Sequence, residues 1–387
     1  MQEPFDYYFF LDGNFPVLSY KECLSVLNVF SGEYLKHQFK IIDELVVFQL
    51  QGDYTDILVS LQKFVRFITL TKNIGFLLHE FNVDIHLGIQ KLIDNIVKEV
   101  FEKKIKMKLN QDLSFRIDII KKGEFDSKSI FNSKNREKIK YDLAYAFIEK
   151  YKFKVNLKNP DICVQVIITD SKILIGVLLF EINRKSIVNR SPANRSYFHP
   201  ASMSPLLIRT MVNLSLTSQK IPHPNSINNV DNNSFKFLDP FTGGAGMLIE
   251  AGEQGYETIG LELGYWECRG ARMNLEYLTN VEITENWSIL RVNSTTIPIK
   301  SNSIDVIVTD PPYGQSTFLG GMKIDILLSK VLYECYRILK NNSRMVISIP
   351  STIEVDFGKF RILDSIENRV HRSLTRVIYL LEKHDLS

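Results

Sequence analysis

The chain has 387 residues, of which 45% are hydrophobic and 24% charged, and its formal net charge is +3. This composition is typical of a globular protein and argues against a disordered or fibrous chain. The length exceeds what a single core usually supports, so we expect two or three domains. No stretch approaches the roughly 20 apolar residues of a membrane helix, and the first residues lack the basic flank of a signal peptide. We therefore expect a cytoplasmic protein that does not enter the membrane.

Cysteine and basic residues are distributed differently along the chain. The four cysteines are scattered and form no CxxC pair, which argues against a zinc site and a disulfide framework, and we expect no metal. Residues 98–158 contain 17 lysines and arginines against 9 acids, and residues 181–209 are also basic. Such segments suggest contacts with a polyanion, although lysine-rich helices are more often simply solvated faces.

Two small α+β units come first. In residues 1–80 the patterns predict strands and helices in the order 7–11 (strand), 20–30 (helix), 45–50 (strand), 53–67 (helix) and 74–78 (strand). In residues 81–185 they predict a helix at 83–101, a strand at 115–120, a helix at 135–149, and strands at 163–169 and 173–180. A short polar turn joins the last two strands, which indicates a hairpin. Each unit is expected to fold around a mixed sheet.

The composition then changes to that of a linker. Residues 186–205 are polar and carry Pro192, Pro200 and Pro205, which is typical of irregular structure. A helix is predicted at 206–216, because proline is tolerated in a first helical turn. We therefore assign residues 186–216 to a linker and helix. The following stretch, 218–234, is rich in Asn, Pro and Ser and is predicted to be an exposed loop.

The remainder, residues 217–387, alternates between strands and helices. Short apolar strands are predicted at 235–238, 258–261, 306–309 and 344–349, and two more at 361–364 and 376–381. Such alternation indicates an α/β domain, in which a parallel sheet is covered by helices on both faces. Ligands of such domains bind at the carboxyl ends of the central strands.

A glycine-rich turn lies at the first of these strand ends. Residues 239–246 read DPFTGGAG and join a strand to a helix, where glycine lets the backbone approach a ligand closely. The turn is neither a GxGxxG fingerprint nor a phosphate loop with its lysine, so the ligand need not be a phosphate. About twenty residues on, Glu262 ends the next strand, where a carboxylate can accept hydrogen bonds from ribose hydroxyls. Asn293, near a later strand end, is placed to bond an adenine edge.

The most specific motif is Asp310-Pro311-Pro312-Tyr313, which follows a buried strand. The two prolines fix the backbone, so the Asp310 carboxylate and the carbonyl after it can point at one spot. An exocyclic amine donates two hydrogen bonds, and two acceptors would direct its lone pair toward an electrophile while Tyr313 stacks on the base. The proton could then leave to Asp310 or to water. A purely structural turn is the less favoured interpretation.

These motifs resemble those of class I methyltransferases that act on base amino groups. Upstream, residues 157–161 resemble the close of a THUMP domain, an RNA-binding module, and residues 190–200 and 371–376 are similar to the archaeal-type tRNA (guanine-10 N2)-methyltransferases. The resemblance implies a ferredoxin-like domain, a THUMP domain and a Rossmann-like class I methyltransferase domain. It also implies S-adenosylmethionine as cofactor and the N2 amine of a guanine in tRNA as acceptor.

The resemblance assigns roles to individual residues. The catalytic set is Asp310, Pro311, Pro312 and Tyr313. The expected cofactor contacts are Asp239, Phe241, Gly243, Gly246, Glu262, Asn293 and Asp310. The expected RNA contacts come instead from the basic stretches, and they are Lys121, Lys158, Arg190 and Arg195.

The sequence departs from the family pattern at two positions and leaves alternatives open. Ala245 stands where glycine is usual, and Asn293 stands where aspartate is usual. The charge missing at Asn293 predicts adenine binding weaker by about 0.5 to 1.5 kcal/mol. The alternatives are a DNA adenine-N6 or cytosine-N4 methyltransferase, which can use the same acceptor geometry, and a non-catalytic tRNA-binding protein. The expected partners are tRNA and, where activity requires one, a helper subunit on an otherwise monomeric enzyme.

Overall fold

The computed structural model describes most of the chain. The described residues are 5–82, 91, 93–94, 113–122, 133–199, 202–217, 235–279, 286–313, 322–372 and 374–384. Most of the predicted helix at 83–101, the predicted loop at 218–234 and Pro200 of the linker lie outside them. The chain divides into two compact units. Unit 1 comprises residues 1–13, 33–61 and 71–182, and unit 2 comprises residues 14–32, 62–70 and 183–387.

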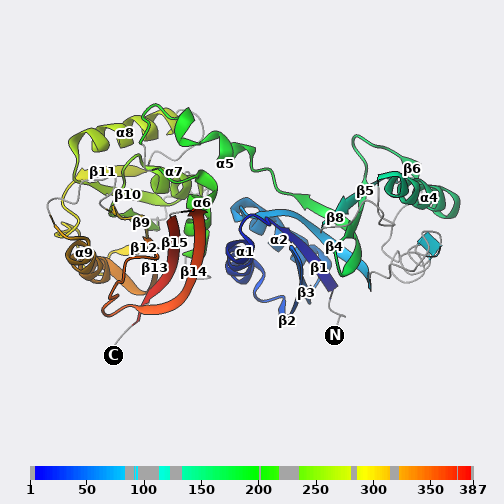
Figure 1. Ribbon diagram of the computed structural model, residues 1–387, viewed down its shortest axis with the longest axis horizontal. Coiled ribbons are helices and arrows are strands. Elements are labelled where there is room, and N and C mark those ends of the chain that lie inside the picture. Colours follow the sequence, from blue (N-terminus) through cyan, green and yellow to red (C-terminus); the bar gives the residue numbers. More distant parts are fainter. Residues whose placement is uncertain are drawn as a thin grey trace. The chain divides into compact units, whose positions relative to one another are not determined.

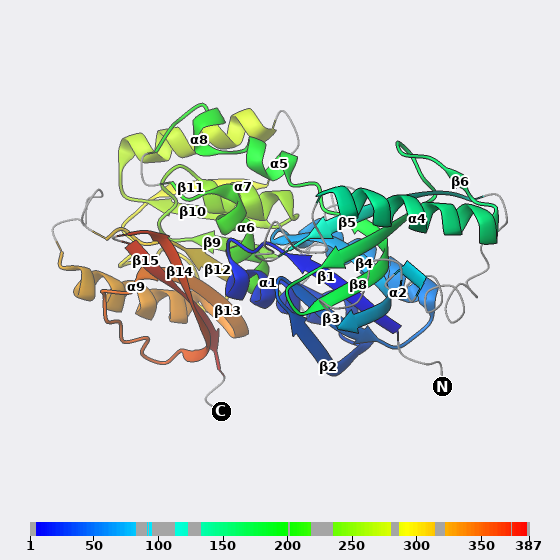
Figure 2. The same cartoon turned by 45° about the vertical axis from the view of Figure 1, so that its right-hand side comes forward.

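Unit 1 is built on one eight-stranded mixed sheet of order β2-β3-β1-β4-β8-β7-β5-β6 (Figure 2). Its elements are β1 (Phe5–Leu11), β2 (Leu35–Ile42), β3 (Leu45–Leu50), α2 (Tyr54–Phe67), β4 (Thr71–Asn82), β5 (Ser114–Lys121), α4 (Ser133–Tyr151), β6 (Lys154–Val155), β7 (Ile162–Ile168) and β8 (Lys172–Glu181). The end of α2 belongs to unit 2. Strand β2 was not predicted, because its sequence alternates between lysine and apolar residues only weakly.

The two α+β units expected from the sequence share this sheet. Strand β4 of the first pairs antiparallel with β8 of the second, and β8 pairs with β7 as the predicted hairpin. Tyr8 of β1 lies fully buried in the middle, and its hydroxyl donates to Gln165 Oε1 at 2.8 Å. Its ring occupies the space where Gly75 and Gly176 have no side chain, since a Cβ there would lie 2.1 Å and 2.5 Å from it. One core thus crosses the sequence-based boundary at residue 80.

Unit 2 contains a seven-stranded sheet of order β11-β10-β9-β12-β13-β15-β14 (Figure 1). Its elements are α1 (Pro16–Ser31), α5 (Lys185–Asn189), a short 3-10 helix (Pro192–Asn194), α6 (Pro205–Leu214), β9 (Lys236–Asp239), α7 (Gly246–Glu253), β10 (Glu257–Glu262), α8 (Tyr265–Thr279), β11 (Trp287–Arg291), β12 (Ile304–Thr309), α9 (Ile324–Ile338), β13 (Leu339–Pro350), β14 (Arg361–His371) and β15 (Leu374–Lys383).

The sheet of unit 2 is parallel from β11 to β13, as expected, and antiparallel where β15 joins β13 and β14 joins β15. Every residue of β12 is buried, which is typical of a central strand covered on both faces. Apolar side chains of α9, among them Leu327, Val331 and Ile338, form a core cluster with Leu238 and Ile307 of the sheet. The fold therefore matches the predicted α/β class, with an antiparallel pair added at one edge.

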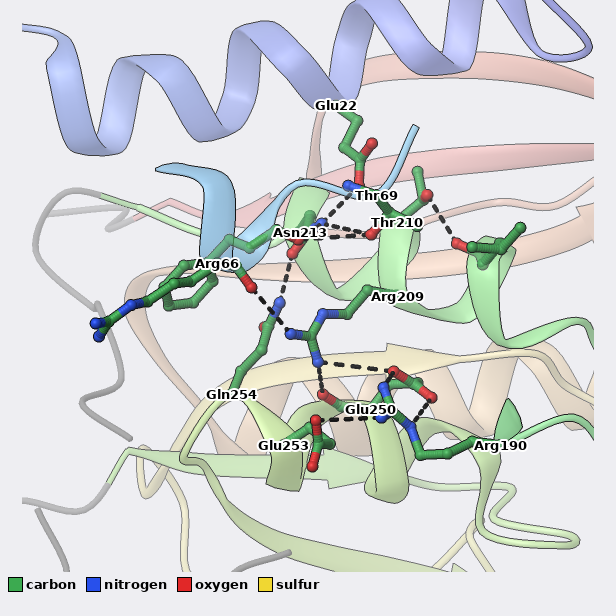
Figure 3. A network of polar contacts seen from close by, with 12 residues as sticks. Glu22, Arg66, Thr69, Arg190, Arg209, Thr210, Asn213, Glu250, Glu253 and Gln254 are labelled. Carbon is green, nitrogen blue, oxygen red and sulfur yellow. Dashed lines mark hydrogen bonds and ion pairs between the residues drawn. The ribbon is translucent and has the colours of Figure 1, made fainter. Parts of the chain in front are cut away.

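Helix α1 was expected to belong to a separate N-terminal domain, yet it lies in unit 2. The cause is a group of buried polar contacts that join α1 and the segment before β4 to α6 and α7 (Figure 3). The Glu22 carboxylate accepts from the Thr69 and Leu70 amides at 3.1 Å and 2.7 Å, and also from Asn213 Nδ2. Asn213 Oδ1 in turn accepts from Gln254 Nε2.

No described helix is both long and apolar enough to cross a membrane.

Candidate active site

Four predicted polar residues meet at one edge of the unit 2 sheet. Asp239 is the last residue of β9, Glu262 of β10, and Asp310 directly follows β12, while Asn293 lies two residues after β11. These four strands are parallel neighbours in the order β11-β10-β9-β12. Their carboxyl ends therefore share one edge, which is where ligands of such sheets bind.

Two hydrogen bonds of Thr242 fix the glycine-rich turn to β9 and β10. Thr242 N–H donates to the Leu261 carbonyl at 2.9 Å, and the Thr242 hydroxyl donates to the Asp239 carbonyl at 3.1 Å. Gly243 and Ala245 both have positive φ, 49° and 63°. A side chain at Gly243 would be strained, and Ala245 carries such strain, because L-residues other than glycine rarely adopt this conformation. These two positive φ angles turn the chain sharply from β9 into helix α7.

Asp239 fixes this turn to the neighbouring strand. It is 2% exposed, and its Oδ1 accepts from the Thr309 hydroxyl at 2.8 Å and the Phe241 amide at 3.1 Å. Burial raises the pKa of its carboxyl to about 7, against the lowering effect of these hydrogen bonds. The Asp239 carboxylate is therefore committed to holding the turn beside the strand that leads to Asp310.

The Glu262 carboxylate bridges two strand ends. Its Oε2 accepts from the Gly243 amide at 3.0 Å, and its Oε1 accepts from the Leu263 and Gly264 amides at 2.8 Å and 3.0 Å. A carboxylate offers about four acceptor positions, so these three bonds orient it and leave capacity for a hydroxyl donor. The geometry suits a ligand diol lying beside the glycine turn.

Asn293 differs from expectation. Its Oδ1, the atom expected to accept from adenine, instead accepts from the Thr295 amide at 3.0 Å and the Thr295 hydroxyl at 2.9 Å. This is an Asx turn, in which the side chain mimics a backbone turn. The oxygen is thus engaged locally, and the amide group of Asn293 is the part of the side chain left to meet a ligand.

Tyr313 is anchored through its hydroxyl. The Tyr313 hydroxyl donates to the Ser348 carbonyl, near the end of β13, at 2.8 Å. Pro311 and Pro312 fix the backbone between this anchor and Asp310. The ring is therefore held from both ends beside the strand edge, as a stacking platform requires.

The Asp310 carboxylate has a partner that the sequence did not indicate. Arg376 of β15 places Nη2 3.5 Å from Asp310 Oδ2, and the two side chains are 13% and 16% exposed. Burial raises the pKa of the Asp310 carboxyl to about 7, the Arg376 charge acts to lower it, and the charge of Asp239 raises it further. Only the antiparallel pairing of β15 with β13 brings these residues together, so spacing along the chain gave no signal.

The expectation that Arg190 and Arg195 contact RNA phosphates is wrong. They are 7% and 9% exposed. Arg190 binds the Glu250 carboxylate through Nε and Nη2, at 2.9 Å and 2.7 Å, and lies 3.2 Å from Glu253 (Figure 3). Arg195 Nε donates to the Arg190 carbonyl at 3.0 Å. Both guanidinium groups pack the linker against α7, because a basic residue in a linker can serve a buried acid as readily as a phosphate.

Asn274 of α8 is a second residue that the sequence did not single out. Its Oδ1 accepts from the Tyr197 amide at 2.7 Å, and its Nδ2 donates to the Tyr197 and Gly244 carbonyls, both at 3.0 Å. It is fully buried. Asn274 thereby ties the linker to the glycine turn.

The other two expected RNA contacts lie in unit 1. Lys121 ends β5, and Lys158 is exposed in the loop after β6.

No group of acids, histidines and cysteines in the described residues could hold a metal ion.

Comparison with known proteins identifies both parts of the chain. Residues 88–178 match the THUMP domain, and residues 192–378 match the RMKL-like methyltransferase domain. TrmN from Thermus thermophilus has the same fold, with a TM-score of 0.53 at 16% identity over 98% of this chain and 99% of that one. SMU.472, solved as a complex with SAH, gives 0.52 at 13% identity over both full chains. The fold and its strand-end site define a methyltransferase that carries a THUMP domain.

Archaeal relatives narrow this class. The tRNA (guanine(10)-N2)-dimethyltransferase of Methanocaldococcus jannaschii is 30% identical over 71% of this chain and 72% of its own length. The protein of that name from Pyrococcus abyssi is 31% identical over 64% of this chain and 69% of its own length. For the Methanothermobacter thermautotrophicus protein, at 30%, the match spans 59% of this chain and 64% of the relative, just under two thirds. The chain belongs to the tRNA (guanine(10)-N2)-dimethyltransferase family.

Proposed function

We propose that this chain transfers methyl groups from S-adenosylmethionine to the exocyclic N2 of a guanine in tRNA, at position 10. The observation that carries the proposal is the placement of Asp310 and the anchored Tyr313 beside the glycine turn and Glu262, at one strand edge. The residues that would hold the amine thus lie next to the residues that would bind a nucleoside. The names of the archaeal relatives supply the base, the position and the RNA class.

The residues present fit S-adenosylmethionine. The Glu262 carboxylate keeps acceptor capacity for ribose hydroxyls, and it lies beside the sharp turn at Gly243, from whose amide it accepts. Asn293 lies beyond the next strand and would face the adenine. When bound, this cofactor supplies an electrophilic methyl group on a sulfonium.

The residues of the chain would hold the amine for attack. In the first methyl transfer, Asp310 and the carbonyl after it would accept hydrogen bonds from the two N–H groups of the amine. The nitrogen lone pair would then point away from them, toward the methyl carbon. Methylation would leave N2 with a positive charge and a surplus proton. The N2 proton leaves to Asp310 or to water. Tyr313 stacks on the guanine and fixes its plane.

The THUMP match supports RNA rather than DNA as substrate. Lys158, exposed after β6, and Lys121 would contact the tRNA backbone from this part of the chain. Such contacts contribute sequence-independent affinity that falls with salt. Methylation of a DNA amine is the alternative that the acceptor geometry alone would allow.

Nucleoside mass spectrometry tests the proposal. Purified protein and S-adenosylmethionine are incubated with a tRNA transcript carrying G10, with the same transcript carrying A10, and with duplex DNA. We expect N2-methylguanosine and N2,N2-dimethylguanosine from the G10 transcript only, and neither with Asp310→Ala. Methyladenine or methylcytosine in the DNA would contradict the proposal, as would guanine methylation of the A10 transcript.

Calorimetry distinguishes the enzyme from a non-catalytic tRNA-binding protein. We expect wild type to bind S-adenosylmethionine and Glu262→Ala to bind it more weakly, because the ribose loses its acceptor. Binding of tRNA without any binding of the cofactor at millimolar concentration would favour the non-catalytic alternative.

A further inference from the structure

Asp310 lies between two groups of opposite charge. Arg376, on β15, is 3.5 Å from its Oδ2, while Asp239, at the end of β9, repels its negative charge. Ser348 of β13 also lies near this carboxyl, but its hydroxyl makes no hydrogen bond within the described residues. The carboxyl is nearly buried, so its ionisation depends on which neighbour dominates. Arg376 is the only cation among the described groups that act on it.

The contact occupies one carboxylate oxygen and leaves the other free. Asp310 Oδ1 is buried and has no hydrogen-bond partner among the described residues. A buried acceptor without a partner costs about 1 to 3 kcal/mol, so such an atom is often explained by a ligand. Arg376 faces Oδ2 at 3.5 Å, so the oxygen left for a ligand is Oδ1.

Ionisation decides whether Oδ1 can accept an amine. A protonated carboxyl carries its proton on one oxygen. Because Arg376 is a donor next to Oδ2, that proton would sit on Oδ1, which would then donate toward the amine instead of accepting from it. A carboxylate accepts only. The pair with Arg376 therefore determines both the charge of Asp310 and the direction of its free oxygen.

We propose that Arg376 is a positioning residue that keeps Asp310 ionised and turns its Oδ1 toward the exocyclic amine of the substrate. The inference rests on the proposed function and adds a residue of the antiparallel edge to the site. Arg376 touches neither the amine nor the methyl group in this role. The N2 proton passes to Oδ1 or to water as the C–N bond forms, and Arg376 stays charged throughout.

The test is a pH profile of single-turnover methylation with three variants. Arg376→Met removes the charge, Arg376→Lys keeps it, and Arg361→Met is the matched control. Arg361 lies on the neighbouring strand β14 and forms an exposed pair with Glu382 at 3.4 Å. Circular dichroism and S-adenosylmethionine binding establish that each variant is folded.

We expect the wild-type rate to rise with pH and reach half its maximum near pH 7, where burial places the pKa of Asp310. The methylation rate of Arg376→Met should fall on the order of tenfold or more at pH 7 and recover much of this loss by pH 9. The reason is that, below the pKa, each unit by which the pKa of Asp310 rises lowers its ionised fraction tenfold. Arg376→Lys should keep most of the wild-type profile, and Arg361→Met all of it. An equal loss at every pH, or no loss at all, would overturn the proposal.

A second readout does not depend on activity. Infrared difference spectra of wild type minus Asp310→Asn report the protonated carboxyl band of Asp310 across pH without cofactor or tRNA. In Arg376→Met this band should persist to higher pH, and in Arg376→Lys it should not. If Arg376→Met is unfolded, the Lys variant decides, since a midpoint far from the wild-type value contradicts the proposal. Failure of the proposed function would show instead as wild type that makes no N2-methylguanosine.

Discussion

Glu22 of helix α1 and Asn213 of helix α6, 191 positions apart, share a buried hydrogen bond. The same Glu22 carboxylate accepts two backbone amides from the segment that precedes β4. Asn213 also donates to the Phe67 carbonyl at 2.7 Å. An N-terminal helix is in this way built into the body that carries the methyltransferase site. A fragment that begins at the linker would leave Asn213 Nδ2 without its acceptors on Glu22 and Phe67.

Stability should depend on pH through Glu22. Burial raises the pKa of its carboxyl to about 7. A raised pKa contributes stability that is present below the unfolded value near 4.5 and is lost as pH rises through about 7. Between those values, wild type should lose on the order of 3 kcal/mol relative to Glu22→Gln, which cannot ionise. Urea unfolding at a series of pH values measures this difference. The exposed Glu33→Gln should follow wild type, and parallel curves for wild type and Glu22→Gln would contradict the assignment.

Arg190→Ala should destabilise the protein strongly. It leaves the fully buried Glu250 without its bidentate partner, and breaking such a pair costs about 3 to 5 kcal/mol. Thermal and urea unfolding measure the loss, with exposed Lys185→Ala, on the helix just before, as a control expected within about 0.5 kcal/mol of wild type. Among folded molecules the salt dependence of tRNA binding should be unchanged. A slope reduced by about one would mean that Arg190 meets a phosphate after all.

Ala245→Gly should stabilise the protein modestly. Ala245 has a φ of 63°, which costs an L-residue about 1 to 2 kcal/mol. Glycine removes this strain, but it also raises the conformational entropy of the unfolded chain, which offsets part of the gain. We expect a gain of about 0.5 to 1 kcal/mol by denaturant unfolding. Ala251→Gly, also buried but inside helix α7, should instead lose about 1 kcal/mol or more. Equal effects of the two changes would show that backbone conformation is not the cause.

Asn293→Asp should tighten cofactor binding. The Asx turn with Thr295 uses one side-chain oxygen, and aspartate would add a second that can accept from the adenine amine. One hydrogen bond contributes about 0.5 to 1.5 kcal/mol, so we expect a dissociation constant about two- to tenfold lower in calorimetry. Thr295→Val, which removes only the hydroxyl partner, serves as a comparison. Weaker binding of the Asp variant would indicate that the Asn293 amide donates to the ligand.

Tyr313→Phe should separate anchoring from stacking. It removes the 2.8 Å bond to the Ser348 carbonyl and keeps the ring. We expect a several-fold fall in the methylation rate, corresponding to about 1 kcal/mol, while Tyr313→Leu should fall much further because it removes the stacking face as well. Single-turnover assays at saturating tRNA measure both. Comparable losses in the two variants would assign the whole effect to the hydroxyl.

Much of the fold followed from local patterns. The strands around Leu238, Leu261 and Ile307 were predicted because buried parallel strands are short apolar runs. The strand ends after them located Asp239, Glu262 and Asp310 at one edge, since parallel neighbours share that edge. By contrast β2 was missed, and helix α1 was assigned to a separate domain, because nothing near Glu22 in the sequence indicates what its carboxylate will meet.

The sequence by itself determined the class of sheet, the glycine turn and the Asp310 motif, because each depends on residues within a few positions of one another. The tertiary structure decided which charges pair. It placed Arg376 at Asp310 across 66 positions and buried Arg190 against Glu250 across 60. An arginine in a sequence has the same charge whether its partner is a phosphate or a buried carboxylate. Only the packing of distant elements removes water from around that charge, and a charge without water needs a partner of opposite sign.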